Sequence, residues 1–233
     1  MAPRSPQPGR WPRLRSPRDR HDPWVDRRNT ERRSHRIKDV RLVDRLGERV
    51  ASPLLTLVDD ATNPRSLGAD SHDGEGLACR PTTLIKDGVL NAFLFDSYTG
   101  RKANRPSTGS AHRAITRVAV SRHARHGSVR ATGILDDLIA EVDDGVLVFS
   151  MKGLHSGVNP VSGDFSVGID GIRIRNGVLS EPISECTAAS TLQKILLSIR
   201  SLGSDAKPLA NGAIVPSMIV DDVMLSGDND ASR

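Results

Sequence analysis

The chain has 233 residues, enough for one sizeable hydrophobic core or two small ones. Its net charge of +5 is uneven: residues 1–46 contain 14 Lys and Arg against 6 Asp and Glu, which leaves 19 basic and 22 acidic residues for the remainder. The basic balance therefore belongs to the first fifth of the chain and does not make the whole protein a nucleic-acid binder. Two cysteines in separate segments exclude a disulfide framework and a cysteine-rich zinc site, and no apolar run approaches the roughly 20 residues that span a bilayer.

Residues 1–46 have the composition of a disordered segment. Six of the fourteen prolines precede position 25, arginine is frequent and apolar residues are scarce. Such a segment buries too little apolar surface to offset the entropy lost on ordering, and it lacks the apolar stretch of a secretory signal. We weigh a basic arm for nucleic acid or an acidic partner against translation from an upstream start or a shifted reading frame, and we favour the latter.

The pattern of a folded domain begins near Val50. The stretch ASPLLTLVDD predicts a short strand, TTLIKDGVLNAFLF a hairpin that turns around Lys86-Asp87-Gly88, and RAITRVAVS (113–121) another strand. A helix is expected from an N-cap at Thr132 to a stop at Gly145, because its apolar residues recur at helical spacing.

The second half of the chain continues with strands. GVLVFSM predicts a strand, and GIRIRNGVLSEPI predicts a hairpin with Asn176-Gly177 in a type I′ turn. Residues 190–202 carry apolar side chains on one helical face, and Gly203 is expected to end that helix. AIVPSMIVDDVMLSG then predicts one or two closing strands.

These elements favour an α+β fold, a mainly antiparallel β-sheet with two short helices. The absence of strand–helix alternation argues against a Rossmann arrangement. We expect two parts, a basic Pro/Arg-rich disordered segment at 1–46 and a folded domain at 47–233.

Several motifs occur together in an order that resembles one family. They are LVDD, D-x-E-G, SYT-x-R-K, STG-x-A and NPVSGDFS, spread from Gly47 to Gly227. In this order they resemble the C-terminal domain of the TldD/PmbA family, the metalloprotease-related proteins also called modulators of DNA gyrase.

The resemblance implies a cytoplasmic complex of two related subunits that cleaves unfolded or flexible peptides. In the TldD type, an H-E-x-x-x-H helix and a Cys near the C-terminus hold zinc, whose open position activates water. The TldE/PmbA type lacks these ligands and serves as the partner. None of the seven histidines here is followed by Glu, and NGAIVPSM contains no Cys. The resemblance is therefore closest to the metal-free TldE/PmbA type, with no cofactor in this chain, zinc in a TldD-type partner, and residues 1–46 in place of the family's N-terminal domain.

The stretch HSGVNPVSGDFSVGIDG holds the groups of a nucleophilic triad, with His155 between Asp164 and either Ser162 or Ser166. No G-x-S-x-G nucleophile elbow accompanies them, so we interpret the stretch as scaffold and substrate groove.

By resemblance this stretch lines the family's peptide cleft. Its tentative cleft residues are His155, Asn159, Gly163 and Asp164. No catalytic or metal-binding residue is assigned to this chain.

Other polar stretches have plainer interpretations. His123-x-x-His126 fits a solvated basic loop better than a metal site, and DSHDGEG misses the 12-residue calcium-loop pattern. Two other functions stay open: a nucleic-acid-binding protein that acts through its basic arm, and a truncated, non-functional family member. The partners that we expect are a TldD-type zinc subunit or a like subunit and a peptide substrate; we expect no membrane partner and do not favour nucleic acid.

Overall fold

A computed structural model describes most of the chain beyond residue 41. The described residues are 42, 44–66, 68–112, 120–121, 126–129, 133–154, 156–159, 162–208 and 213–227. Of the predicted disordered segment 1–46, the structure describes residues 42 and 44–46, and most of the predicted strand 113–121 lies outside the described ranges. Contacts group residues Val40–Arg233 into one compact unit, and that unit is the subject below.

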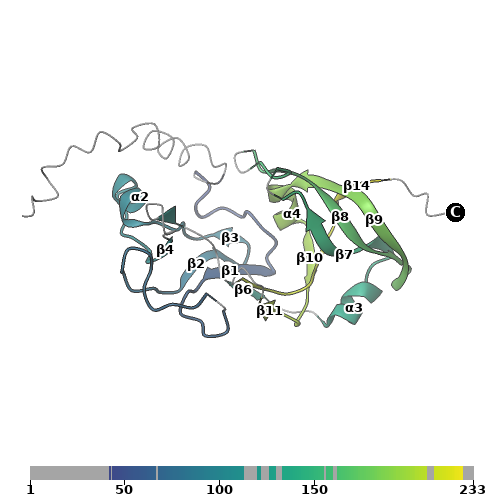
Figure 1. Ribbon diagram of the computed structural model, residues 1–233, viewed down its shortest axis with the longest axis horizontal. Helices are drawn as coiled ribbons and strands as arrows, with labels where there is room; N and C mark the ends of the chain where they lie inside the picture. Colours follow the sequence, from purple (N-terminus) through teal and green to yellow (C-terminus); the bar gives the residue numbers. More distant parts are fainter. Residues whose placement is uncertain are drawn as a thin grey trace, which may run out of the picture. The chain divides into compact units, whose positions relative to one another are not determined.

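Two sheets contain most of the strands (Figure 1). The first has the order β11-β12-β6-β1-β2-β3 and the second the order β14-β9-β8-β7, and two further pairs are β10-β13 and β4-β5. All neighbours are antiparallel except β12 and β6, which are parallel at Ile214 and His126. The strands are β1 Leu55–Asp59, β2 Thr82–Lys86, β3 Val89–Leu90, β4 Ala111–His112, β5 Val120–Ser121, β6 His126–Val129, β7 Asp144–Lys152, β8 Asp164–Arg175, β9 Val178–Thr191, β10 Ile199–Leu202, β11 Lys207–Pro208, β12 Ile214–Val215, β13 Met218–Val220 and β14 Met224–Ser226.

Both predicted hairpins are present. Asp87 and Gly88 have φ of 47° and 80°, and Asn176 and Gly177 have φ of 49° and 74°. Two successive positive φ angles define the type I′ turn, whose twist matches that of the flanking strands. The second turn joins β8 and β9, which form the long ribbon of the four-stranded sheet (Figure 1).

Three short helices accompany the strands: α2 Ser97–Lys102, α3 Leu135–Ala140 and α4 Leu192–Leu197. The mainly antiparallel α+β fold is confirmed, with α2 as a helix that periodicity did not predict. Each helix has six residues, and nothing in the described ranges provides a helix that would reach across a bilayer.

The bounds of the two predicted helices were wrong. The first predicted helix, α3, begins after Ile134 rather than after Thr132. It ends at Ala140, and Gly145, its expected stop, lies in β7. The second stops at Leu197, because Ile199–Leu202 forms strand β10 and pairs with β13. The closing stretch contains three strands rather than one or two.

Two buried clusters stabilise the unit. The larger one joins the first sheet to β10 and contains Val50, Ala51, Leu55, Ile85, Leu90, Ile199 and Leu202. The other lies on one face of the second sheet and contains Phe165, Val167, Ile169 and Ala188, with Ile195 of α4 packed against it. Leu202 and Ile169 are 0% and 1% exposed, and burial of such a side chain contributes about 1.5–3 kcal/mol.

Candidate functional site

The loop between β7 and β8 is held by its own hydrogen bonds. Asn159 donates its N–H to the carbonyl of Asp164 at 2.8 Å, and Gly163 donates to the carbonyl of Asn159 at 2.8 Å. The side-chain oxygen of Asn159 accepts from the N–H of Ser162 at 3.2 Å. Gly163 has φ of 77°, the left-handed conformation that glycine adopts without a steric penalty. These bonds therefore bring Asn159 close to the described residues Ser162, Gly163 and Asp164 in a tight turn.

This turn packs against the start of α4. Leu192 donates its N–H to the carbonyl of Gly163 at 2.8 Å, and a Cβ on Gly163 would lie 2.5 Å from the Oε1 of Gln193. Thr191, whose Oγ1 caps α4 by accepting the N–H of Lys194, pairs with Asp164 across the sheet. The start of α4 thus fixes the position of the turn.

The structure brings together three of the four tentative cleft residues. Asn159 and Asp164 are exposed and Gly163 is buried between them. His155 lies outside the described residues. The assignment of all four to a peptide cleft stays a prediction.

The serines of this stretch are arranged for structure. Ser162 Oγ donates to the Oδ2 of Asp164 at 2.6 Å and accepts the N–H of Asp164 at 3.3 Å, so its hydroxyl closes the turn. Ser166 lies in β8, and its N–H donates to the carbonyl of Gly157 at 2.7 Å. In a nucleophilic triad a histidine takes the serine proton, and among the described residues no histidine bonds Ser162 or Ser166.

A second polar cluster joins three of the sequence motifs. Glu75 of D-x-E-G accepts from the N–H and the Oγ of Ser97 at 2.9 and 2.6 Å, at the start of the SYT-x-R-K helix. Asp73 accepts backbone N–H groups from both sides, including that of Ala111 in STG-x-A at 3.1 Å. The sequence pattern of DSHDGEG excluded a calcium loop and did not predict these contacts, although the shared motif order was a signal that the segments meet.

The same cluster fixes α2. Asp96 is 2% exposed and caps the helix by accepting the N–H and Oγ1 of Thr99 at 2.6 and 2.8 Å. Thr108 Oγ1 accepts the N–H of Phe95 at 2.9 Å, and Thr108 donates its own N–H to the Phe95 carbonyl. The carboxylates and hydroxyls here satisfy backbone groups, which makes the cluster a rigid support.

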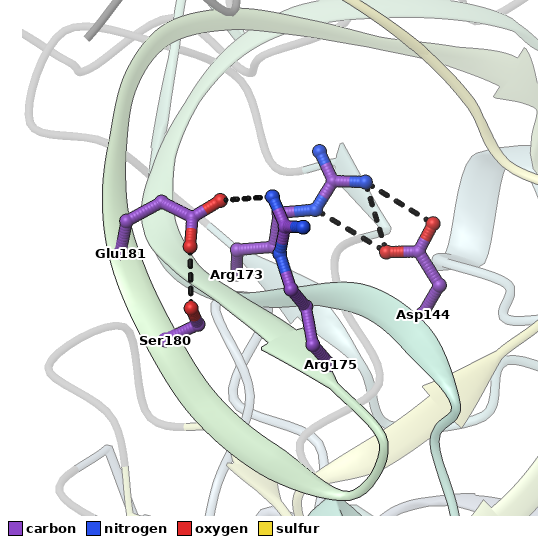
Figure 2. Close-up of polar contacts among 5 residues, drawn as sticks. All are labelled: Asp144, Arg173, Arg175, Ser180 and Glu181. Carbon is purple, nitrogen blue, oxygen red and sulfur yellow. Dashed lines mark hydrogen bonds and ion pairs between the residues drawn. The ribbon is translucent and has the colours of Figure 1, made fainter. Parts of the chain in front are cut away.

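Ion pairs line the hairpin end of the second sheet, where Arg173 reaches toward Asp144 and Arg175 toward Glu181 (Figure 2). Arg173 donates to both carboxylate oxygens of Asp144 at 2.9 and 3.1 Å. The Ser180 hydroxyl and the Arg175 guanidinium lower the pKa of Glu181 to about 2, because both stabilise the charged carboxylate.

A cleft of about 280 Å³ lies beside these pairs, and Arg173, Cys186 and Ser226 contribute to its lining. Both cysteines, Cys79 and Cys186, are free thiols and half-buried.

The described residues do not fit a zinc ion. A structural or catalytic zinc site needs at least three protein ligands, and in the described part of the chain no three His, Cys, Asp or Glu side chains come together for one. The segment Ala213–Met218, where the TldD type is expected to have its Cys, contributes β12 and the start of β13 instead.

Comparisons with known proteins agree with the motifs. The family model described as the PmbA/TldA metallopeptidase C-terminal domain matches residues 30–227. The metalloprotease PmbA homolog of Haemophilus influenzae is 29% identical over 187 residues, which cover 80% of this chain and 39% of that relative. The Escherichia coli metalloprotease PmbA is 28% identical over 175 residues, which cover 75% of this chain and 36% of that relative. The chain thus spans well under half the length of these curated relatives.

Solved structures lead to the same family. The crystal structure of TldE from Thermococcus kodakarensis superposes with a TM-score of 0.74 at 27% identity, covering 84% of this chain and 45% of that one. A Thermotoga maritima structure described as a modulator of a DNA gyrase gives a TM-score of 0.72 at 26% identity, covering 81% and 43%. The chain therefore belongs to the PmbA/TldD metallopeptidase family, whose C-terminal domain it matches.

Proposed function

We propose that this chain acts as a TldE/PmbA-like, metal-free subunit of a cytoplasmic TldD–TldE peptidase complex. The complex cleaves unfolded or flexible peptides, and a TldD-type subunit supplies the zinc. This chain contributes a partner interface and part of the cleft wall, to which we assign His155, Asn159, Gly163 and Asp164.

One combination of observations carries the proposal. The chain matches a metallopeptidase domain from residue 30 to residue 227, yet none of its seven histidines precedes a glutamate. The described residues also offer no three-ligand set for a metal. A partner subunit of the TldE type would belong to the family and lack the zinc-binding motif, and this chain has both features.

Metal content and partner binding test the proposal directly. The purified chain is mixed with a TldD-type subunit from the same organism and passed over a sizing column, and each peak is analysed for zinc after dialysis. We expect a mixed complex that carries about one zinc and an isolated chain that carries none at the affinity of a dedicated site. About one zinc per isolated chain, or no complex with the TldD-type subunit, would refute the proposal.

Peptide cleavage by the reconstituted complex tests the role of the turn. Ser162→Ala and Ser166→Ala should each leave the cleavage rate within about tenfold, or ~1.4 kcal/mol of barrier, because neither serine is placed as a nucleophile. Gly163→Val should lower the rate more, because it strains a turn that packs on α4. Loss of cleavage in either serine variant together with a harmless Gly163→Val would instead support a serine hydrolase.

A further inference from the structure

Four cationic side chains surround the end of α2 and the loop that follows it. Arg101 and Lys102 form the last turn of α2, and Arg105 follows three residues later. Arg80 donates from its guanidinium to the carbonyl of Ser107 in the same loop. All four side chains are exposed. We refer to Arg80, Arg101, Lys102 and Arg105 as the basic patch.

The backbone under the basic patch is held closely. The N–H of Arg105 donates to the carbonyl of Gly100 at 2.8 Å, and a Cβ on Gly100 would approach the Arg105 carbonyl oxygen to 2.7 Å. The Lys102 ammonium lies 4.9 Å from the centroid of the Tyr98 ring, within cation–π range. The backbone that carries these cations is therefore held in place.

The carboxylates of the adjoining motifs are engaged with other groups. Asp73 accepts three backbone N–H groups, Glu75 accepts both donors of Ser97, and the buried Asp96 caps α2. Within the described residues, neither the Arg101 nor the Arg105 guanidinium takes part in a hydrogen bond or an ion pair. Exposed guanidinium groups without carboxylate partners, such as those of Arg101 and Arg105, attract an anionic ligand.

A role confined to stabilising the helix does not account for the whole patch. Cations in a last helical turn interact favourably with the helix dipole, which explains Arg101 and Lys102. Arg105 lies beyond the helix and Arg80 comes from a different segment, so the dipole gives no reason for their convergence on this loop.

We propose that the basic patch binds acidic segments of the peptide substrate. Guanidinium groups bind carboxylates through paired hydrogen bonds, and two such groups stand here without an acidic partner. A six-residue helix is too short to read a DNA groove, and Lys102 already covers the nearby Tyr98 ring. These features favour a carboxylate-bearing peptide over nucleic acid. The inference rests on the proposed peptidase function, and it specifies that the peptide substrate carries acidic segments.

Binding of labelled peptides to the full chain tests the inference by fluorescence anisotropy at low and physiological salt. The probes are a flexible glutamate-rich peptide, the same peptide with glutamine in place of every glutamate, and a single-stranded DNA of equal charge. The patch variant combines Arg101→Gln, Lys102→Gln and Arg105→Gln. The control variant combines Arg65→Gln, Lys86→Gln and Lys207→Gln, three exposed cations elsewhere, so that both lose the same charge.

We expect the patch variant to bind the glutamate peptide about tenfold more weakly, because each exposed charge contact is worth about two- to threefold in affinity. The control variant should stay within about twofold, and the glutamine peptide should bind neither protein measurably. Equal weakening in both variants, or equal affinity for the glutamine peptide, would overturn the inference. Tighter, patch-dependent binding of the DNA would overturn it in favour of a nucleic-acid site.

Unfolding curves of the two variants show whether each is folded. Should the patch variant fail to fold, the single change Arg105→Gln replaces it, with Lys86→Gln as its control. We then expect Arg105→Gln to weaken binding of the glutamate peptide about two- to threefold and Lys86→Gln to leave it unchanged. The assay contains no second subunit and no cleavage step. Patch-dependent peptide binding without complex formation would refute the proposed function alone, and a zinc-loaded complex without patch binding would refute this inference alone.

Discussion

In the β7–β8 turn, some residues determine the backbone conformation and others add side-chain hydrogen bonds to it. Gly163 has φ of 77° and is buried, whereas Ser162 is half-exposed and bonds the exposed Asp164. An L-residue in the left-handed region costs about 1–2 kcal/mol, while an exposed hydrogen bond contributes about 1 kcal/mol or less. The backbone conformation is therefore the stronger determinant of this turn.

Replacement of glycine by alanine checks this ranking. Gly163→Ala should lower the free energy of unfolding by about 1–2 kcal/mol, measured by urea denaturation. Gly168→Ala is the matched control, because Gly168 has no positive φ and its Cβ would meet the Lys152 Cβ at an ordinary 3.6 Å. Equal effects of the two changes would show that conformation at Gly163 is not limiting.

The low pKa of Glu181 gives a second prediction for single residues. The Ser180 hydroxyl is the largest cause and Arg175 the next, so Ser180→Ala should raise the pKa of Glu181 from about 2 further than Arg175→Gln does. Because the folded pKa is depressed, the stabilisation by Glu181 is complete above about pH 4.5 and is lost as the pH falls toward 2. NMR titration of the Glu181 carboxyl carbon measures both shifts, and the reverse order of the two variants would contradict the structure.

At the scale of elements, α2 depends on its cap. It has six residues, no acidic residue in its first turn and one buried residue, Gly100, so burial of apolar side chains contributes little to it. Asp96 caps it with a carboxylate that is 2% exposed, and Thr99 reciprocates toward the N–H of Asp96 at 3.1 Å. A helix this short is unstable in isolation, so the cap has a large share in forming it.

Substitution of the cap should therefore destabilise the unit. Asp96→Ala leaves the Thr99 N–H and hydroxyl without their acceptor, and we expect a loss of about 1–2 kcal/mol in the free energy of unfolding. Asp96→Asn keeps an oxygen that accepts at the same place and should lose less than half of that. Circular dichroism in urea measures both, and equal losses would assign the effect to the charge instead of the cap.

An element could be predicted from the sequence when neighbouring residues determine it, and could not when contacts between distant segments do. The hairpins at Asp87-Gly88 and Asn176-Gly177 were predicted because adjacent residues determine a type I′ turn. Residues 199–202 were assigned to a helix because short apolar runs fit both periodicities, and their pairing with β13 is a tertiary effect. Helix α2 has no apolar periodicity, although Asp96 and Thr99 three residues apart were a capping signal.

The candidate site shows the same limit. Asn159, Gly163 and Asp164 are neighbours in one turn, so sequence alone grouped them. The bonds from Glu75 to Ser97 and from Asp73 to Ala111 join separate segments, and only the fold reveals them.

At the scale of the whole molecule, the boundary of the folded unit matters. Leu42 packs against the larger buried cluster, and Gly47 and Glu48 exchange backbone hydrogen bonds with Leu90. Residues just before the predicted boundary at Gly47 therefore contribute to the packing of the first sheet.

Two truncations locate the boundary. Deletion of residues 1–39 should leave the urea midpoint essentially unchanged, because that composition supports no core. Deletion of residues 1–46 should cost a further 1 kcal/mol or so, since it also removes the half-buried Leu42. Loss of the cooperative unfolding transition after deletion of residues 1–39 would show that the basic segment is needed for folding.

The parallel pairing of β12 with β6 has a consequence for synthesis of the chain. Strands β7, β8 and β9 are consecutive and can pair with one another as soon as β9 has emerged from the ribosome, whereas the other edge of β9 waits for β14. The first sheet has its middle strands early, but β11 and β12 come from near the end of the chain. We expect the β7–β8–β9 ribbon to form first, and β6 and β9 each to keep an open edge until translation is almost complete. During that period these edges are exposed to aggregation and to chaperones.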